Sequence, residues 1–194
     1  MTTILASGSP RRKEILEMLG VQDLLILPAK GEEVPPEGAG PAETVEALAM
    51  AKAREVAALR QREGHSDDLI IAADTIVWHE ERIFGKPHSE EEAKAMLCSL
   101  SGRTHEVYTG VALICRGREL RGHERTAVSF RAMTEEEVCA YVATGEPMDK
   151  AGAYGAQGKG ALFVTGIEGD FFNVMGLPVC RLALMLKETG AGLI

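Results

Sequence analysis

Two arginines follow a short run of small residues near the N-terminus, and this arrangement suits the binding of an anion. The run Ala6–Arg12 reads ASGSPRR and stands between a short β-type segment and a helical one. Small residues allow a tight turn with free backbone N–H groups, Ser9 can cap the helix, and a proline suits its first turn. Arg11 and Arg12 add fixed positive charge beside the positive end of the helix dipole. We expect phosphate to bind here, with Ser7 among its contacts; an ordinary turn with solvated arginines is the alternative.

Two lysines occupy positions that can be explained either by a role in a functional site or by the fold alone. Lys52 falls between Leu48 and Val56 on the apolar stripe of a long predicted helix that also includes Val45 and Leu59, so it faces the core or a cleft. Alternatively, its stem packs on the core while its amine reaches water. Lys86 follows a predicted strand end, between a glycine and a proline that fix the backbone. A solvated loop lysine is the alternative there.

Carboxylates complete the set of candidate site residues. Asp74 directly follows the apolar run 69–73, where α/β enzymes carry metal ligands and general bases; an aspartate that caps a turn has the same pattern. Glu32 and Glu33 lie in a loop, where acidic residues are usually solvated. Together with the four cations above, these carboxylates suit a magnesium-bound polyphosphate, with oxygen ligands for the metal and point charges for the phosphates.

The composition of the chain excludes other classes of protein. At 194 residues, 45% hydrophobic and 26% charged, it fits a soluble globular protein with a single domain, 1–194. A net charge of −8 disfavours nucleic-acid binding, which needs a broad basic surface. No apolar run reaches the length of a membrane span, and no signal-peptide pattern precedes the first strand. We therefore expect a cytoplasmic protein that binds neither nucleic acid nor membrane.

The four cysteines are predicted to be small buried hydrophobic residues in a reducing compartment. Cys98, Cys115, Cys139 and Cys180 lie far apart, with no CxxC pair and no histidine at metal-finger spacing. A disulfide is the less favoured alternative.

The elements that must position these residues alternate between strand and helix. Periodicity and breakers predict strands at 2–6, 24–27, 69–73, 106–115, 119–133, 161–165 and 171–174, with a hairpin at 75–84 around His79–Glu81 and a turn at 166–170. They predict helices at 10–19, 41–62, 89–102, 134–145 and 178–188, and Ser89 with Glu92 and Thr134 with Glu137 form predicted capping boxes. The expected architecture is an α/β fold: a mixed, twisted sheet flanked by helices, in two lobes around an active-site cleft.

Six motifs, in this order and spacing, resemble the Maf family of nucleoside triphosphate pyrophosphatases over nearly the whole chain. They are Ala6–Arg12, Ala73–Val77, Gly85–Pro87, Leu100–Val107, Asp149–Gly158 and Gly176–Pro178. The resemblance implies a fold similar to the inosine triphosphatases, hydrolysis of a nucleoside triphosphate to the monophosphate and pyrophosphate, and a divalent cation, Mg²⁺ or Mn²⁺. We also expect a homodimer.

The same resemblance implies roles for individual residues. Asp74 is the implied proton acceptor, Glu33, Lys52 and Lys86 are its active-site partners, and Glu33 and Asp74 are the metal ligands. The loop that ends at Glu33 is one residue longer than the family pattern, so Glu32 is the alternative partner.

The expected chemistry is in-line attack of water on the α phosphorus, and catalysis is mainly positioning and charge neutralisation. Arg11 or Arg12 and Lys86 are expected to hold phosphate oxygens. Asp74 either deprotonates the water or only orients it. His105 is a rival base, although a histidine at a strand entry more often makes structural hydrogen bonds.

The resemblance also links Arg11, Thr75 and Gln157 to base specificity. A branch of the family that looks specific for 7-methylguanosine triphosphate carries Ser-Asp-Gln and Lys-Ser-Glu where this chain has Ala-Asp-Thr at 73–75 and Gly-Ala-Gln at 155–157. One neutral amide can donate to and accept from the imide edge of uracil or thymine. We therefore expect hydrolysis of dTTP and UTP; alternatively, Gln157 only braces its glycine-rich loop.

Two other functions are alternatives, and each predicts a different result. A purine triphosphate pyrophosphatase would prefer purines, and a non-catalytic regulator of septum formation would bind nucleotide without turnover.

Overall fold

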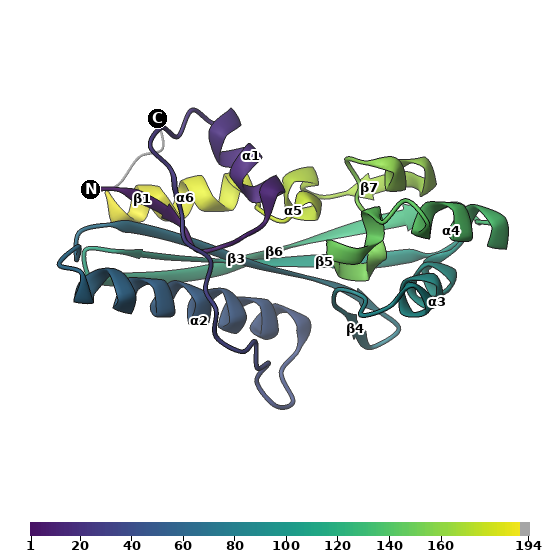
Figure 1. Ribbon diagram of the computed structural model, residues 1–194, viewed down its shortest axis with the longest axis horizontal. Coiled ribbons are helices and arrows are strands. Elements are labelled where there is room, and N and C mark those ends of the chain that lie inside the picture. The colour runs from purple at the N-terminus through teal and green to yellow at the C-terminus, as the bar shows by residue number, and fades with distance from the viewer. Residues whose placement is uncertain (191–194) are drawn as a thin grey trace. The chain divides into compact units, whose positions relative to one another are not determined.

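The computed structural model describes residues 1–190, in which strands and helices alternate and form a mixed sheet (Figure 1). The strands hydrogen-bond in the order β2-β1-β3-β5-β6-β7, and β4 pairs with β3. The strands are β1 (Thr3–Leu5), β2 (Leu25–Ile26), β3 (Leu69–His79), β4 (Arg82–Phe84), β5 (Thr104–Cys115), β6 (Arg118–Phe130) and β7 (Val164–Glu168). The α-helices are α1 (Pro10–Met18), α2 (Pro41–Arg62), α3 (Glu90–Leu100), α4 (Glu135–Val142), α5 (Phe171–Met175) and α6 (Val179–Thr189). The predicted α/β class with a mixed sheet is confirmed.

The chain divides into two compact units, and each has its own hydrophobic core. The first unit comprises residues 1–74, 109–124 and, in the described part, 176–190; the second comprises 75–108 and 125–175. The boundary falls directly after Asp74, inside strand β3.

In the first unit, helices cover both faces of the parallel strands. β1 pairs in parallel with β2 and β3, and Ile4 stands opposite both Leu25 and Ile70. Figure 1 shows α2 along one face of the strands and α6 along the other. Gly110 of β5 needs to be glycine, because a Cβ there would lie 2.2 Å from the backbone oxygen of Val45 in α2. This close approach fixes the height of α2 above the sheet.

Helix α2 matches its predicted bounds, and both of its ends are stabilised. Pro41 occupies the first turn and basic residues the last, as the helix dipole favours. Near the C-terminal end, Arg60 donates to Asp68, which also accepts a hydrogen bond from the backbone N–H of Thr2. This contact ties the end of α2 to the start of the sheet.

The second unit has an aromatic core. Phe130 makes edge-on contacts with His105 and Tyr154, and Tyr141 does the same with Phe163. Such geometry is favoured between aromatic rings because their positive edges meet negative faces. The unit also contains the β3–β4 hairpin, the α3 and α4 helices and three short 3-10 helices, Glu146–Asp149, Ala151–Ala153 and Lys159–Phe163.

The two predicted capping boxes have different outcomes. Thr134 and Glu137 form the reciprocal box at the start of α4, as predicted. At α3, the Ser89 hydroxyl accepts from the backbone N–H of Glu92, but the Glu92 carboxylate accepts from the N–H of His88 rather than from Ser89. The second box is therefore only half formed.

Three strand predictions were wrong. β3 does not end before Asp74 but continues to His79, so Asp74 lies inside a strand. Of the predicted strand 161–165, residues 161–163 belong to a 3-10 helix and only 164–165 are in a strand, because β7 begins there and continues into the predicted turn as far as Glu168. The predicted strand at 171–174 is helix α5, because Asp170 accepts from the N–H of Phe172 and the amide of Asn173 is held by Val107 and Thr126. Local capping and a buried polar anchor override the β propensity of Phe-Phe-Asn-Val.

The prediction for the cysteines was wrong for three of the four. Cys115 is buried, whereas Cys98, Cys139 and Cys180 are exposed, and all four thiols are free. Leu59 also departs from its predicted apolar stripe, because it is 41% exposed near the end of α2. Within residues 1–190, no helix has the length and apolar character that a bilayer span requires.

Candidate active site

The ammonium group of Lys52 lies between two carboxylates in the first unit. Its Nζ is 2.5 Å from Oδ1 of Asp74 and 2.8 Å from Oε1 of Glu33. The Lys52 side chain is 15% exposed and that of Asp74 only 9%, whereas Glu33 is 55% exposed. The structure therefore brings these three predicted residues together. The amine of Lys52 lies in an ion-paired cluster rather than in open water.

The local fold explains this arrangement. Lys52 lies one turn beyond Leu48 on α2, so its stem follows the buried face of the helix. Asp74 lies three residues beyond Ile71, which is the last β3 partner of β1 in the parallel pairing. Although β3 continues, the carboxylate stands just past the point where β1 ends. Asp74 therefore lies near the carboxyl end of β1 and not at the carboxyl end of β3.

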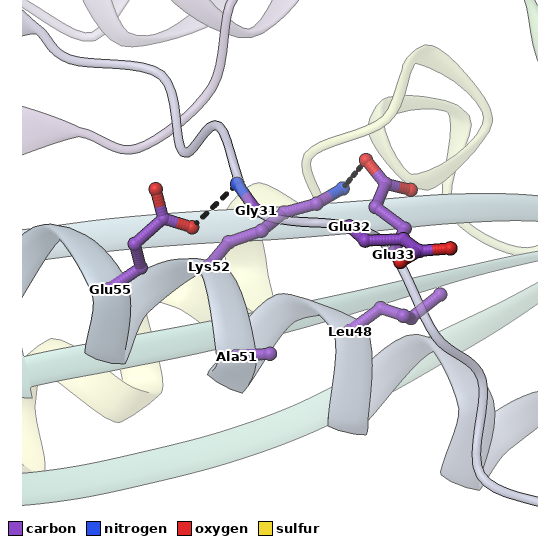
Figure 2. Close-up of a pocket in the computed structure, with 7 residues that line it drawn as sticks. All are labelled: Gly31, Glu32, Glu33, Leu48, Ala51, Lys52 and Glu55. Carbon is purple, nitrogen blue, oxygen red and sulfur yellow. Dashed lines mark hydrogen bonds and ion pairs between the residues drawn. The ribbon is translucent and has the colours of Figure 1, made fainter.

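The loop that carries Glu33 is attached to the same helix face by a residue that the sequence analysis missed. Glu55 lies three positions after Lys52, and its carboxylate accepts from the backbone N–H groups of Lys30 at 2.7 Å and Gly31 at 2.9 Å. Figure 2 shows Lys52 and Glu55 holding the loop side by side, one by a side chain and the other by the backbone. The spacing of three positions on an amphipathic helix could have indicated that Lys52 and Glu55 share a face. The backbone contacts of Glu55 could not be predicted, because a carboxylate bound to backbone groups has no sequence signature.

A small open pocket lies beside this cluster (Figure 2). It is lined by Gly31, Glu32, Glu33, Leu48, Ala51, Lys52 and Glu55. Of the two glutamates predicted as alternatives, Glu33 is the one that pairs with Lys52.

The predicted anion-binding turn is held by side-chain contacts within the first unit. Arg12 donates from Nε to the carbonyl of Gly176 at 2.8 Å and from a terminal nitrogen to Oγ of Ser7 at 2.8 Å. Ser9 occupies the N-cap position of α1, but its side chain makes no capping bond, which corrects the prediction. Instead, its backbone N–H donates to Ser7. The first and last motifs of the chain are therefore joined by one guanidinium.

Electrostatics connects this turn with the carboxylate cluster. The pKa of Arg12 is lowered, chiefly by burial; the charge of Arg11 also lowers it, while the carboxylates of Asp74 and Glu33 partly offset these effects. An arginine remains charged under such shifts. The causes show that two cations and two carboxylates lie within electrostatic reach of one another. A site that contains both fixed arginines and carboxylates suits an anionic ligand that brings a cation with it.

The other predicted site residues belong to the second unit. Thr75 is half-buried in β3, directly after Asp74 in the chain. Lys86 is exposed in the segment after β4, and Gln157 is exposed in the glycine-rich loop.

The geometry of His105 supports the structural alternative and not a role as base. Its side chain is 1% exposed, and Nε2 lies 2.8 Å from the hydroxyl of Tyr154. Burial and, to a smaller extent, the nearby His79 lower the pKa of His105 to about 3. A buried imidazole with this environment stays neutral and belongs to the aromatic core.

The donor chemistry of the cluster fits a divalent cation such as Mg²⁺. Proteins commonly hold Mg²⁺ through one or two carboxylates, with substrate phosphates and water completing the shell. Glu33 and Asp74 reach a common ammonium, so their oxygens already approach one point. Among residues 1–190, no group of three or more His, Cys, Asp or Glu side chains forms a complete metal site. A metal at this cluster would need ligands from the substrate, as a polyphosphate can provide.

Comparison with known proteins agrees with the motifs. The family profile described as Maf-like protein matches residues 2–189. A dTTP/UTP pyrophosphatase of Bacillus cereus strain AH820 is 52% identical over 185 residues, which cover 95% of this chain and 94% of the relative. A dTTP/UTP pyrophosphatase of Bacillus anthracis has the same identity and coverage.

Two solved structures are more distant in sequence. One is a HAM1 protein from Coxiella burnetii, with 17% identity, 97% coverage of this chain, 100% of that chain and a TM-score of 0.48. The other is a nucleoside-triphosphatase / dITP/XTP pyrophosphatase from Mycobacterium abscessus, with 20% identity, coverage of 69% and 76%, and a TM-score of 0.43. The profile match over nearly the whole chain, together with relatives at 52% identity, shows that this chain belongs to the Maf-like protein family.

Proposed function

We propose that this chain is a nucleoside triphosphate pyrophosphatase that converts dTTP and UTP to the monophosphate and pyrophosphate. Relatives that share 52% of their residues with it carry the name dTTP/UTP pyrophosphatase. The observation that carries the proposal is the ion-paired cluster in which Lys52 bridges the buried Asp74 and the solvent-facing Glu33.

Asp74 and Lys52 have the central roles in the proposed mechanism. Asp74 accepts a hydrogen bond from the attacking water and receives its proton or orients it, while Lys52 fixes the carboxylate through their contact. Glu33 and Asp74 would hold a divalent cation, and such a cation would supply charge neutralisation for the phosphates. Exposed ion pairs contribute little to stability, so Glu33 exchanges Lys52 for another cation at small cost.

The phosphates are proposed to bind at the turn around Arg12. Ser7 and Gly176 fix this guanidinium, so it is already oriented before the substrate arrives. Arg11 and Lys86 supply further positive charge to the phosphate oxygens. Pyrophosphate leaves as a stabilised polyanion, and no covalent intermediate is required.

Base selection is assigned to Gln157, with Thr75 and Arg11 as further contributors. The exposed Gln157 side chain is available to a ligand, and the hydrogen bonds that fix its loop come from other residues, which argues against a bracing role. Its amide can donate to a carbonyl of uracil or thymine and accept from the imide N–H.

Gln157→Glu tests base selection directly. Loss of the donor places an acceptor against a base carbonyl, so kcat/KM for dTTP should fall by roughly tenfold or more while that for GTP changes little. Equal losses for dTTP, CTP and GTP would show that Gln157 does not read the base.

Lys86→Met tests phosphate binding with the same substrates. It should reduce kcat/KM for every nucleotide alike, because phosphates are common to all. A selective loss for one base would contradict that role.

The protein is proposed to act in the cytoplasm, where its nucleotide substrates are found, and to form a homodimer. Sedimentation equilibrium tests the homodimer.

A further inference from the structure

The loop that presents Gln157 is held at both of its ends by one pair of side chains, Tyr141 and Glu146. The hydroxyl of Tyr141 donates to Oε1 of Glu146 at 2.9 Å and accepts from the backbone N–H of Gly155 at 3.1 Å. Glu146 also accepts from the N–H groups of Lys159 at 3.0 Å and Gly160 at 3.2 Å. Gln157 lies between these two attachment points.

The glycines of the loop lie very close to the side chains of Tyr141 and Glu146. A Cβ on Gly158 would lie 2.4 Å from Oε1 of Glu146, and one on Gly160 would lie 2.8 Å from the hydroxyl of Tyr141. At Gly160 a Cβ would also lie 2.7 Å from the backbone oxygen of Gly155, so the close approach there requires glycine, whereas at Gly158 a Cβ would displace the Glu146 carboxylate. The glycine-rich sequence therefore serves a tight wrap around Glu146 rather than a flexible linker.

The surroundings of Glu146 favour its ionised carboxylate. Burial raises the pKa of Glu146, but hydrogen bonds from Lys159, Gly160 and Tyr141 and the charge of Lys150 lower it, and the net pKa is lowered. Lys150 donates to the backbone carbonyl of Glu146 at 2.7 Å, which fixes its main chain as well. Hydrogen bonds to an ionised acceptor are stronger than neutral ones, so this carboxylate is a firm anchor for the loop.

Tyr141 is anchored through its ring. Its side chain is 4% exposed and packs edge-on against Phe163 in the aromatic core, at 5.2 Å between ring centroids. The hydroxyl is the polar end of a ring that the core holds in one orientation. The loop backbone is thus hydrogen-bonded to the phenol of Tyr141, whose ring packs in the core of the second unit, and to the carboxylate of Glu146.

We propose that Tyr141 and Glu146 are positioning residues for base selection, which act by fixing the loop 155–160 so that Gln157 is presented in one orientation. The inference rests on the proposed function, in which Gln157 reads the base. Selectivity between two bases depends on hydrogen bonds that a displaced amide cannot make, so a loosened loop loses discrimination before it loses turnover. Phosphate contacts and the Lys52–Asp74 cluster belong to other elements and are unaffected.

Tyr141→Phe is the decisive variant because it keeps the ring in the core and removes only the hydroxyl. The kcat/KM values for dTTP and CTP are measured with wild type, Tyr141→Phe, Gln157→Ala and the double variant. We expect Tyr141→Phe to reduce the dTTP-to-CTP ratio about tenfold, mainly through KM for dTTP, and to change kcat for CTP less than about twofold. In the Gln157→Ala background, Tyr141→Phe should leave the ratio unchanged, because the two residues act as one unit.

Glu146→Gln and Glu135→Gln complete the set. Glu146→Gln should resemble Tyr141→Phe, since an amide supplies only one of the two acceptor oxygens. Glu135 is an exposed carboxylate in the first turn of α4, and its variant should retain the wild-type ratio and melting temperature.

Hydrogen exchange tests the loop without any substrate. Tyr141→Phe should accelerate exchange of the Gly155, Lys159 and Gly160 amides and leave the α2 amides at their wild-type rates. Faster exchange with an unchanged dTTP-to-CTP ratio would overturn the link to base selection, and unchanged exchange would overturn the positioning role itself. A proportional loss for both nucleotides, or a further fall of the ratio in the double variant, would also overturn it. A wild type without preference for dTTP would contradict the proposed function instead.

Discussion

Lys52 Nζ lies 2.5 Å from Oδ1 of Asp74, which makes the lysine of α2 the direct partner of the buried carboxylate of β3. The two residues lie 22 positions apart in the sequence and meet because α2 packs across the strands. Oε1 of Glu33 lies 2.8 Å from the same ammonium. One helix residue therefore contacts both carboxylates.

Asp74→Asn should abolish hydrolysis while the fold persists. The change is nearly isosteric, but it removes the charge and the proton acceptor, so kcat should fall by about a hundredfold or more. Activity is measured as pyrophosphate release, and circular dichroism is the control for folding. A folded variant that keeps a tenth of wild-type turnover would remove Asp74 from the mechanism.

Lys52→Met should reduce kcat by about tenfold or more with only a small change in the free energy of unfolding. Methionine keeps the apolar stem on the buried face of α2 and loses only the ammonium that holds the two carboxylates. The comparison is made by steady-state kinetics and urea denaturation on the same preparations. Unchanged kinetics would mean that the Lys52 contacts have no part in turnover.

Glu55→Ala should raise the Mg²⁺ concentration needed for half-maximal activity several-fold. Its carboxylate holds the backbone of Lys30 and Gly31, and exposed hydrogen bonds of this kind contribute roughly 1 to 1.5 kcal/mol each. The loop with Glu33 should therefore loosen without unfolding the protein. A Mg²⁺ titration at fixed dTTP measures this, with Gln61→Ala at an exposed position of α2 as the control. Equal midpoints for both variants would show that the Glu55 contacts do not position the loop.

Acid should weaken the second unit through His105. Burial lowers its pKa from 6.5 to about 3, so the unfolded chain takes up a proton below pH 6.5 that the folded chain refuses. The contribution of this group to stability is complete above pH 6.5 and is lost between pH 6.5 and about 3, at up to about 1.4 kcal/mol per pH unit. Urea denaturation at pH 7 and pH 5 measures the loss.

His105→Gln removes this titration, so the variant should lose less stability than wild type between the two pH values. The difference is read within each protein, which separates it from the cost of the substitution itself. A wild type and a variant with the same pH dependence would contradict the assignment.

The sequence predicted those parts of the site that depend on local patterns. The bounds of α2 follow from a proline start, basic residues at the end and an apolar stripe, and the same stripe identified Lys52. The turn before α1 was recognised from its small residues and paired arginines. The site role of Asp74 stays a prediction, and the end of its strand was misplaced, since an aspartate lowers β propensity while the pairing of β3 with its neighbours continues.

Contacts made by the tertiary structure could not be read from the sequence. Glu55 and Glu146 bind backbone N–H groups of loops that are distant in the chain, and such a role requires no particular motif. Tyr141 has the pattern of an ordinary core residue, and only its hydroxyl distinguishes it. Phe171 and Asn173 have strand-like neighbours, yet buried hydrogen bonds from Asn173 fix them in a helix.

The central claim is that the chain cleaves dTTP and UTP between the α and β phosphates. Wild-type protein with Mg²⁺ is incubated separately with dTTP, UTP, CTP, dGTP, ITP and 7-methylguanosine triphosphate, and nucleotide products, pyrophosphate and inorganic phosphate are quantified. We predict dTMP and UMP with equimolar pyrophosphate, and kcat/KM values for dTTP and UTP above those for the purine nucleotides. Release of single phosphates with formation of dTDP, a preference for purine triphosphates, or nucleotide binding without turnover would contradict the account.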